Sequence, residues 1–252
     1  MSSGVKPFVF ALHGFLGQSS DWNQIQQKLK DSVDFHALDL FSKDSSVITD
    51  LSSYTSELAV QIQQRQSESF STQDIKSRKR IFVGYSLGGR LGLHLLLNHS
   101  DLFDVYIFLS TNVGLPTSAY EERQQRIASD QRWAQQISES SWDLFLQKWN
   151  AQAVFAGSLQ EPARHKSDYD LQKLQQSLDL WSVGRQQSFA EVVKEHQHKV
   201  HWIVGHRDTK YLNAAQNLHE QGCLQEVVPI DSGHRVWCDN PIAVANCIRQ
   251  SI

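Results

Sequence analysis

The sequence predicts an α/β protein with a mostly parallel sheet, helices on both faces of the sheet and one helical insertion. Short runs of β-branched and aromatic residues recur between helix-length segments, and this alternation stops once, between residues 115 and 189. Parallel strands need connections long enough to hold a helix, so the alternation indicates βαβ units. With 252 residues, 40% of them hydrophobic, the chain can build one large core carrying an insertion.

Six runs are predicted as strands, namely residues 8–12, 33–40, 81–84, 105–109, 200–204 and 226–230. Three helices are predicted in the first half, at 21–30 after the cap candidate Ser20, at 54–66 after Ser53, and at 87–99. The final helix is predicted to begin at Pro241, because Asn240 suits an N-cap and proline suits the first helical position.

The segment 115–189 holds no convincing strand, is rich in glutamine and contains four of the seven tryptophans. A glutamine-rich segment can be disordered, but here Trp133, Trp142, Trp149 and Trp181 join other apolar residues at helical spacings and need burial. We therefore expect packed helices that form a cap, residues 115–189, inserted into a core made of residues 1–114 and 190–252.

Charge and composition exclude several classes of protein. Lys+Arg number 24 and Asp+Glu 27, so no global field draws the chain to nucleic acid or to an anionic membrane. No apolar run is long enough for a signal segment or a membrane span, and we expect a cytoplasmic monomer. The three cysteines, at 223, 238 and 247, form no zinc or disulfide pattern and are interpreted as reduced thiols. Neither a phosphate-binding loop nor metal-ligand spacing is evident, so no cofactor or metal is expected.

The strongest local signal is the G-x-S-x-G pattern of residues 84–88, which directly follows a predicted strand and directly precedes a predicted helix. In that setting Ser86 occupies a tight turn, with Gly84 and Gly88 leaving room for the neighbouring strand and helix. The amide of Leu87 and the helix dipole then face any oxyanion that develops near Ser86. We predict that Ser86 is the catalytic serine.

A serine of this kind needs an imidazole and an acid. Among eleven histidines, His234 follows the last predicted strand in a loop before the final helix, which suits a catalytic base. Asp208, after the strand at 200–204, is the predicted acid, and Asp231 is the weaker alternative. The order Ser86, Asp208, His234 is the one expected for a triad on such a sheet.

Two further features surround Ser86. The first strand ends in His13-Gly14-Phe15, a turn whose Phe15 amide is predicted as the second oxyanion donor. Arg90 lies four residues after Ser86 on the same helical face. Arg90 either pairs with a nearby carboxylate or binds an anionic substrate, for which its planar guanidinium is well suited.

Together, the segments HGFLG, GYSLGGR, GHRD and SGH resemble the α/β-hydrolase superfamily and span the core from about residue 8 to the end of the chain. Within it, GYSLGGR, EERQQRIASDQRWAQQ (121–136), FLQKWNAQAVFAGSL (145–159) and HRDTK (206–210) resemble the MenH family, the 2-succinyl-6-hydroxy-2,4-cyclohexadiene-1-carboxylate synthases of menaquinone biosynthesis. The resemblance implies an α/β-hydrolase fold and a lyase that eliminates pyruvate from 2-succinyl-5-enolpyruvyl-6-hydroxy-3-cyclohexene-1-carboxylate. The triad would act as a base toward a ring C–H, and the substrate would carry several carboxylates.

The resemblance also assigns substrate contacts by matching positions. It implies that Tyr85, Arg90, Arg126 and Trp149 bind substrate, with Arg123 assisting; without it, Arg123 and Arg126 would be interpreted as a solvated helical face. For a further cation in the cap, the chain offers Lys166 or Arg164. After the second predicted strand, residues 39–44 lack the proline and glycines common in hydrolases, which changes the loop near the pocket mouth.

Two other functions remain open at this point. The first is a carboxylic ester or thioester hydrolase, in which Ser86 of the same triad forms an acyl-enzyme. The second is a hydrolase-like fold that serves only as a binding module, which the presence of all three triad residues disfavours.

Overall fold

The computed structural model describes residues 6–69, 77–138 and 140–252, and its centre is a six-stranded sheet. All strand pairs are parallel, in the order β2-β1-β3-β4-β5-β6. The strands are β1 (Phe8–Leu12), β2 (Asp34–Leu38), β3 (Arg80–Tyr85), β4 (Val105–Leu109), β5 (Val200–Gly205) and β6 (Val227–Ile230). The predicted α/β fold class is confirmed, and each strand lies within two residues of its predicted bounds.

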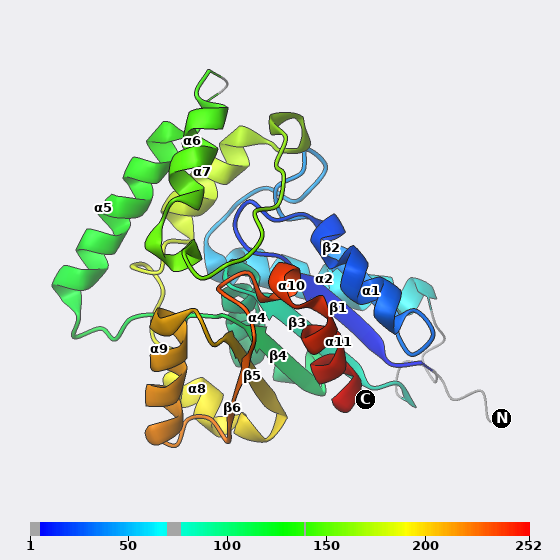
Figure 1. Ribbon diagram of the computed structural model, residues 1–252. Helices are drawn as coiled ribbons and strands as arrows, with labels where there is room; N and C mark the ends of the chain where they lie inside the picture. The colour runs from blue at the N-terminus through cyan, green and yellow to red at the C-terminus, as the bar shows by residue number, and fades with distance from the viewer. Residues whose placement is uncertain (1–5, 70–76, 139) are drawn as a thin grey trace.

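Helices cover both faces of this sheet (Figure 1). The main helices outside residues 115–189 are α1 (Asn23–Leu29), α2 (Leu51–Ser69), α4 (Leu87–Asn98), α8 (Ala190–Glu195), α9 (Thr209–Glu220), α10 (Val236–Asp239) and α11 (Pro241–Gln250). Short 3₁₀ turns are η1 (Ser19–Trp22), η2 (Ser100–Leu102) and η5 (Gln197–Lys199).

Alternation along the strands divides the core into two layers. On one face, Val9, Ala11 and Ile81 pack with apolar residues of α1 and α11. On the other, Phe10 and Phe82 pack with α2, α4, α8 and α9. Both faces are covered, which explains why the strands are near-continuous apolar runs.

Two predicted helix starts are wrong, and two, Leu87 of α4 and Pro241 of α11, are confirmed. The first helical segment begins as the 3₁₀ turn η1 with Gln18 at its N-cap, so Ser20 is not the cap. The helix α2 begins at Leu51, because Asp50 accepts hydrogen bonds from the amides of Ser52 and Ser53. Asn240 does cap α11, accepting a bond from the amide of Ala243.

Residues 115–189, the cap segment, contain helices and no strand among the residues described. Its elements are α5 (Tyr120–Gln136), α6 (Trp142–Asn150), η3 (Ala153–Phe155), η4 (Lys166–Asp168) and α7 (Leu171–Leu180). In Figure 1 α5, α6 and α7 stand together to one side of the sheet. The four tryptophans pack into one aromatic cluster with Phe145, Tyr169 and the core residues Phe15 and Phe41, and Phe15 joins Phe41 to Trp149.

Cap helix α7 also fixes the loop after β2, where the sequence departs from the common hydrolase pattern. The ammonium of Lys173 is buried and donates hydrogen bonds to the carbonyls of Ser42, Lys43 and Ser45. The amide of Asp170 donates to the carbonyl of Phe41. This loop is therefore shaped by the cap segment.

Within the described ranges, no helix is both long and apolar enough to cross a bilayer.

Candidate active site

Ser86 lies at the sharp junction between β3 and α4. Its φ of 49° is left-handed, which is uncommon for a residue with a side chain and costs about 1–3 kcal/mol. Added Cβ atoms would lie 2.6 Å from the Gly89 Cα at position 84 and 2.3 Å from the Leu12 carbonyl at position 88. Glycine at both positions therefore permits the turn that the G-x-S-x-G pattern predicts.

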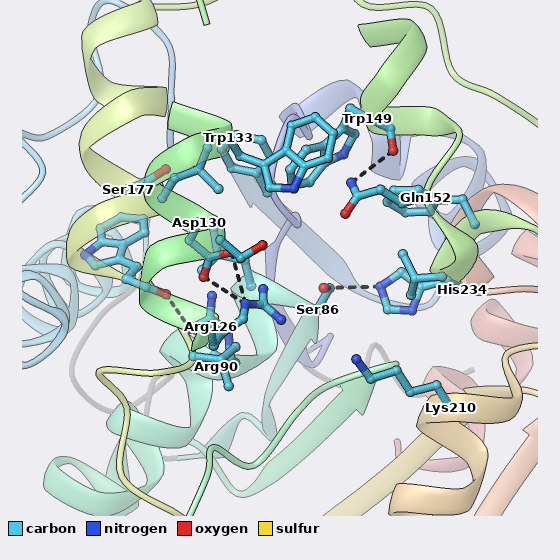
Figure 2. Close-up of a pocket in the computed structure, with 18 of the residues that line it drawn as sticks. Ser86, Arg90, Arg126, Asp130, Trp133, Trp149, Gln152, Ser177, Lys210 and His234 are labelled. Carbon is cyan, nitrogen blue, oxygen red and sulfur yellow. Dashed lines mark hydrogen bonds and ion pairs between the residues drawn. The ribbon is translucent and has the colours of Figure 1, made fainter. Parts of the chain in front are cut away.

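Three side chains from three different loops meet at this junction. The Nε2 atom of His234 lies 3.3 Å from the Ser86 Oγ, and its Nδ1 lies 2.6 Å from the Asp208 Oδ2 (Figure 2). His234 is 3% exposed and Asp208 is 4% exposed. Nδ1 donates to the carboxylate, so Nε2 faces the serine as an acceptor, which is the arrangement of a serine nucleophile or base with its relay.

Local structure fixes the two relay residues. Asp208 caps α9, and its Oδ1 accepts a bond from the amide of Tyr211. The ring of Tyr211 lies 4.5 Å from that of His234 and helps to hold it. The alternative acid, Asp231, has a side chain that is 74% exposed and pairs with Arg207, so the structure does not place it beside His234.

The turn after β1 packs directly against Ser86. A Cβ at Gly14 would lie 3.5 Å from the Ser86 Cβ. His13 Nδ1 contacts the Gly14 carbonyl at 2.7 Å, and its Nε2 accepts from the Leu40 amide at 3.0 Å. Burial lowers the pKa of His13, which favours this neutral, bridging form. Phe15 and Leu87, the residues predicted to supply oxyanion amides, both line the cavity at Ser86.

A cavity of about 400 Å³ opens beside Ser86 and His234, with walls from both the core and the cap segment. That volume suits a small organic ligand. Its aromatic wall consists of Phe15, Trp133, Trp149, Phe155, Trp181 and Tyr211. Its charged lining residues include Arg90, Arg126, Asp130 and Lys210.

Arg90 joins the helix that carries Ser86 to the cap segment. It is only 9% exposed, and its Nη1 donates to the Trp181 carbonyl at 2.6 Å and to the Gln186 Oε1 at 3.1 Å. Burial, together with the nearby Arg126, lowers the pKa of Arg90 to about 10. Among the residues described, Arg90 therefore pairs with two neutral oxygens and not with a carboxylate, which leaves the binding of an anionic substrate as the alternative to test.

Arg126 comes from α5 and carries its own counterion. Its Nε donates to both carboxylate oxygens of Asp130, at 3.0 and 2.8 Å. Burial lowers the pKa of Arg126, but Asp130 outweighs burial and the pKa is raised overall. The guanidinium lines the cavity, as Figure 2 shows, so it is not on a purely solvated face.

Four expected cap or site contacts fall elsewhere. Arg123 does not line the cavity, because its guanidinium donates to the carbonyls of Leu115 and Gln186. Lys166 lies in η4, outside the cavity lining. Tyr85 and Arg164 line a second, smaller cavity of about 70 Å³ that also borders His234. There Arg164 forms a bidentate ion pair with Asp21. Of the predicted substrate contacts, Trp149 lines both cavities, and Phe15, Ser86, Phe155 and His234 also border both.

Several lining residues were not singled out from the sequence. Asp130, Gln152, Lys210 and Tyr211 all border the large cavity. The sequence signal for Lys210 and Tyr211 is that they follow Asp208 by two and three residues, in the first turn of a helix at the carboxyl edge of the sheet. Asp130 lies one helical turn after Arg126, a spacing that favours an ion pair.

A strained serine after a parallel strand, a buried Ser-His-Asp relay and a cavity above the sheet define a serine-triad enzyme of the α/β class. Residues 8–246 match the alpha/beta hydrolase family, and the chain belongs to that family. The predicted α/β-hydrolase fold is thereby confirmed.

Curated relatives match nearly the whole chain. One from Enterobacter sp. (strain 638), named 2-succinyl-6-hydroxy-2,4-cyclohexadiene-1-carboxylate synthase, is 28% identical and covers 97% of this chain and 91% of its own length. One of the same name from Pectobacterium atrosepticum is 26% identical, covering 97% and 93%. The structure titled MenH from S. aureus shares the fold, with a TM-score of 0.79 at 18% identity over 97% of this chain and 92% of that one. The predicted resemblance to the MenH family, and enzyme status, are confirmed.

Proposed function

We propose that this enzyme is a lyase that eliminates pyruvate from 2-succinyl-5-enolpyruvyl-6-hydroxy-3-cyclohexene-1-carboxylate to give 2-succinyl-6-hydroxy-2,4-cyclohexadiene-1-carboxylate. The observation that carries the proposal is a complete triad opening into a cavity that has three cationic side chains. The names of the curated relatives support the same reaction. The proposal includes a role in menaquinone biosynthesis, a cytoplasmic location and a monomeric state.

In this mechanism the triad acts as a base. His234 takes the proton of the Ser86 hydroxyl, and the Ser86 oxygen removes the ring proton next to the succinyl carbonyl. The ring electrons shift, the C–O bond to the enolpyruvyl group breaks, and enolpyruvate leaves and is protonated to pyruvate. Proton removal and loss of the leaving group balance, so no water is consumed.

Charge that builds on the succinyl carbonyl oxygen needs stabilisation. We assign this to the amides of Phe15 and Leu87, at the turn after β1 and at the N-terminus of α4. Asp208 keeps His234 in the tautomer that accepts a proton at Nε2.

Substrate binding follows from the lining of the large cavity. We assign the substrate carboxylates to Arg90 and Arg126 and the ring to the face of Trp149. Tyr85 is assigned an indirect role, because its buried ring lies 5.4 Å from that of His234 and lines the smaller cavity. We interpret residues 115–189 as a cap on a core of residues 1–114 and 190–252.

The second candidate is a carboxylic ester or thioester hydrolase. The Nε2–Oγ contact of 3.3 Å is equally suited to forming an acyl-enzyme at Ser86. A cavity with several cations favours a charged substrate over a neutral ester, so this function ranks second.

The deciding experiment measures pyruvate release, coupled to lactate dehydrogenase, from enzymatically generated substrate. We expect rapid release by the wild type and a loss of at least about 1,000-fold in both Ser86→Ala and His234→Ala. No release above background from the wild type would refute the lyase. Steady turnover of p-nitrophenyl esters or acyl thioesters, lost in Ser86→Ala, would then identify the hydrolase.

A further inference from the structure

Two of the three cations in the large cavity are already engaged within the protein. Nη1 of Arg90 donates hydrogen bonds to two oxygens of the cap segment, and Nε of Arg126 donates to both carboxylate oxygens of Asp130. The Asp130 carboxylate offsets one positive charge. These two arginines also lie close together, on one side of Ser86 (Figure 2). A ligand with carboxylates at opposite ends therefore needs a cation on the other side.

Lys210 lies on that other side. It comes from the first turn of α9, two residues after Asp208, and it lines the large cavity beside Tyr211. In Figure 2 its side chain extends from α9 toward the space below Ser86 and His234, across from Arg90 and Arg126. Within residues 6–69, 77–138 and 140–252, no hydrogen bond or ion pair holds its ammonium group.

The position of Lys210 also fixes it relative to the chemistry. Asp208, which orients His234, is the N-cap of the same helix. A carboxylate bound by Lys210 would thus be held at a fixed position relative to His234, and that position would not depend on the cap segment. A flexible ammonium suits this position, because it meets a carboxylate as a point charge without needing a planar partner.

We propose that Lys210 is a specificity-determining residue that binds one substrate carboxylate on the wall opposite Arg90 and Arg126. The site then selects ligands that carry carboxylates at both ends of a ring. This inference takes its substrate from the proposed lyase function. It assigns to Lys210 the role of the further cation, for which the sequence analysis named Lys166 or Arg164.

The kinetic test compares pyruvate release by Lys210→Gln and Lys210→Arg. A charge-assisted hydrogen bond predicts that Lys210→Gln raises KM by about 10- to 100-fold, with a smaller effect on kcat. Lys210→Arg should recover much of the loss, because the charge is retained. The matched control is Lys194→Gln, an equal change of charge at an exposed position on α8, which should behave as wild type.

A second measurement does not depend on turnover. Calorimetric binding of benzene-1,3,5-tricarboxylate to Ser86→Ala should weaken by a similar factor when Lys210→Gln is added, and binding of benzoate should change much less. Added salt should weaken tricarboxylate binding more with Lys210 present than without it, because an exposed cation is screened.

The outcomes separate the two proposals. If the wild type releases pyruvate and Lys210→Gln leaves KM unchanged, the role of Lys210 is overturned. A loss seen in Lys166→Gln and not in Lys210→Gln would overturn it as well. If the wild type releases no pyruvate, the proposed lyase function is refuted, and the role of Lys210 is then tested by tricarboxylate binding alone. Weaker binding after Lys210→Gln supports a carboxylate site at Lys210, and equal binding rejects it.

Discussion

Arg126 combines a structural contact and a binding role in one side chain. Its Nε is occupied by Asp130, whose side chain is 6% exposed, and the guanidinium still borders the cavity. Removing Arg126 therefore does two things: it takes a cation from the cavity, and it leaves a buried carboxylate without its partner.

These two effects can be separated. We expect Arg126→Ala to raise KM for pyruvate release by about 10-fold or more and also to lower the melting temperature. The double variant Arg126→Ala/Asp130→Ala should regain stability, because no carboxylate remains buried alone, while its KM stays high. Steady-state kinetics and thermal unfolding on the three proteins test this. A double variant with normal KM would show that Arg126 only neutralises Asp130.

Single residues also show how much of the site's geometry the sequence predicts. The sequence predicts that Ser86, Asp208 and His234 lie together, because each follows a strand and parallel strands end at one edge of the sheet, and the structure brings the three side chains together. Arg123 and Lys166 were misplaced because a helical pattern does not reveal which face of the cap meets the cavity. The hydrogen-bond partners of Arg123 are the backbone carbonyls of Leu115 and Gln186, and no sequence pattern predicts such contacts.

At the scale of elements, the site depends on how closely α4 approaches the end of β1. A methyl group at Gly88 would lie 2.3 Å from the Leu12 carbonyl and 2.6 Å from that of His13, both rigid backbone atoms. The N-terminus of α4 and the turn that carries Phe15 are held together by this contact.

We therefore expect Gly88→Ala to push α4 away from β1, lowering stability by about 1–3 kcal/mol. The kcat for pyruvate release should fall as well, because Ser86 and the Leu87 amide move away from the turn after β1. Chemical denaturation and kinetics on the same preparation measure both effects. A variant with normal stability and normal kcat would contradict the proposed role of this contact.

Elements also explain which boundaries the sequence predicts. Strands were placed within two residues because both faces of the sheet are covered and the apolar runs are continuous. The starts of the first two helices were missed because Gln18 and Asp50, not the serines, occupy the capping positions. Capping is a competition between neighbouring polar side chains, and several candidates stood within three residues of each other.

For the whole molecule, buried histidines couple stability to pH. Burial, with Arg90 nearby, lowers the pKa of His94 to about 4 from its ordinary 6.5, and its ring packs on Phe189. Burial lowers the pKa of His13 too. Between pH 6.5 and about 4 the unfolded chain therefore binds more protons than the folded one, and the free energy of unfolding falls as the pH drops.

We expect the melting temperature to fall progressively from pH 7 to pH 5, and to fall less steeply in His94→Gln, which cannot be protonated. Scanning calorimetry at several pH values measures the slope. Equal slopes in the two proteins would mean that His94 does not contribute to this dependence.

The aromatic wall of the cavity gives the protein a built-in optical signal. Three of its seven tryptophans, Trp133, Trp149 and Trp181, line the large cavity. A ligand that enters exchanges water for its own atoms against these indoles, and indole emission responds to the polarity of its surroundings. Occupancy of the cavity can therefore be followed by intrinsic fluorescence, without a label and without turnover.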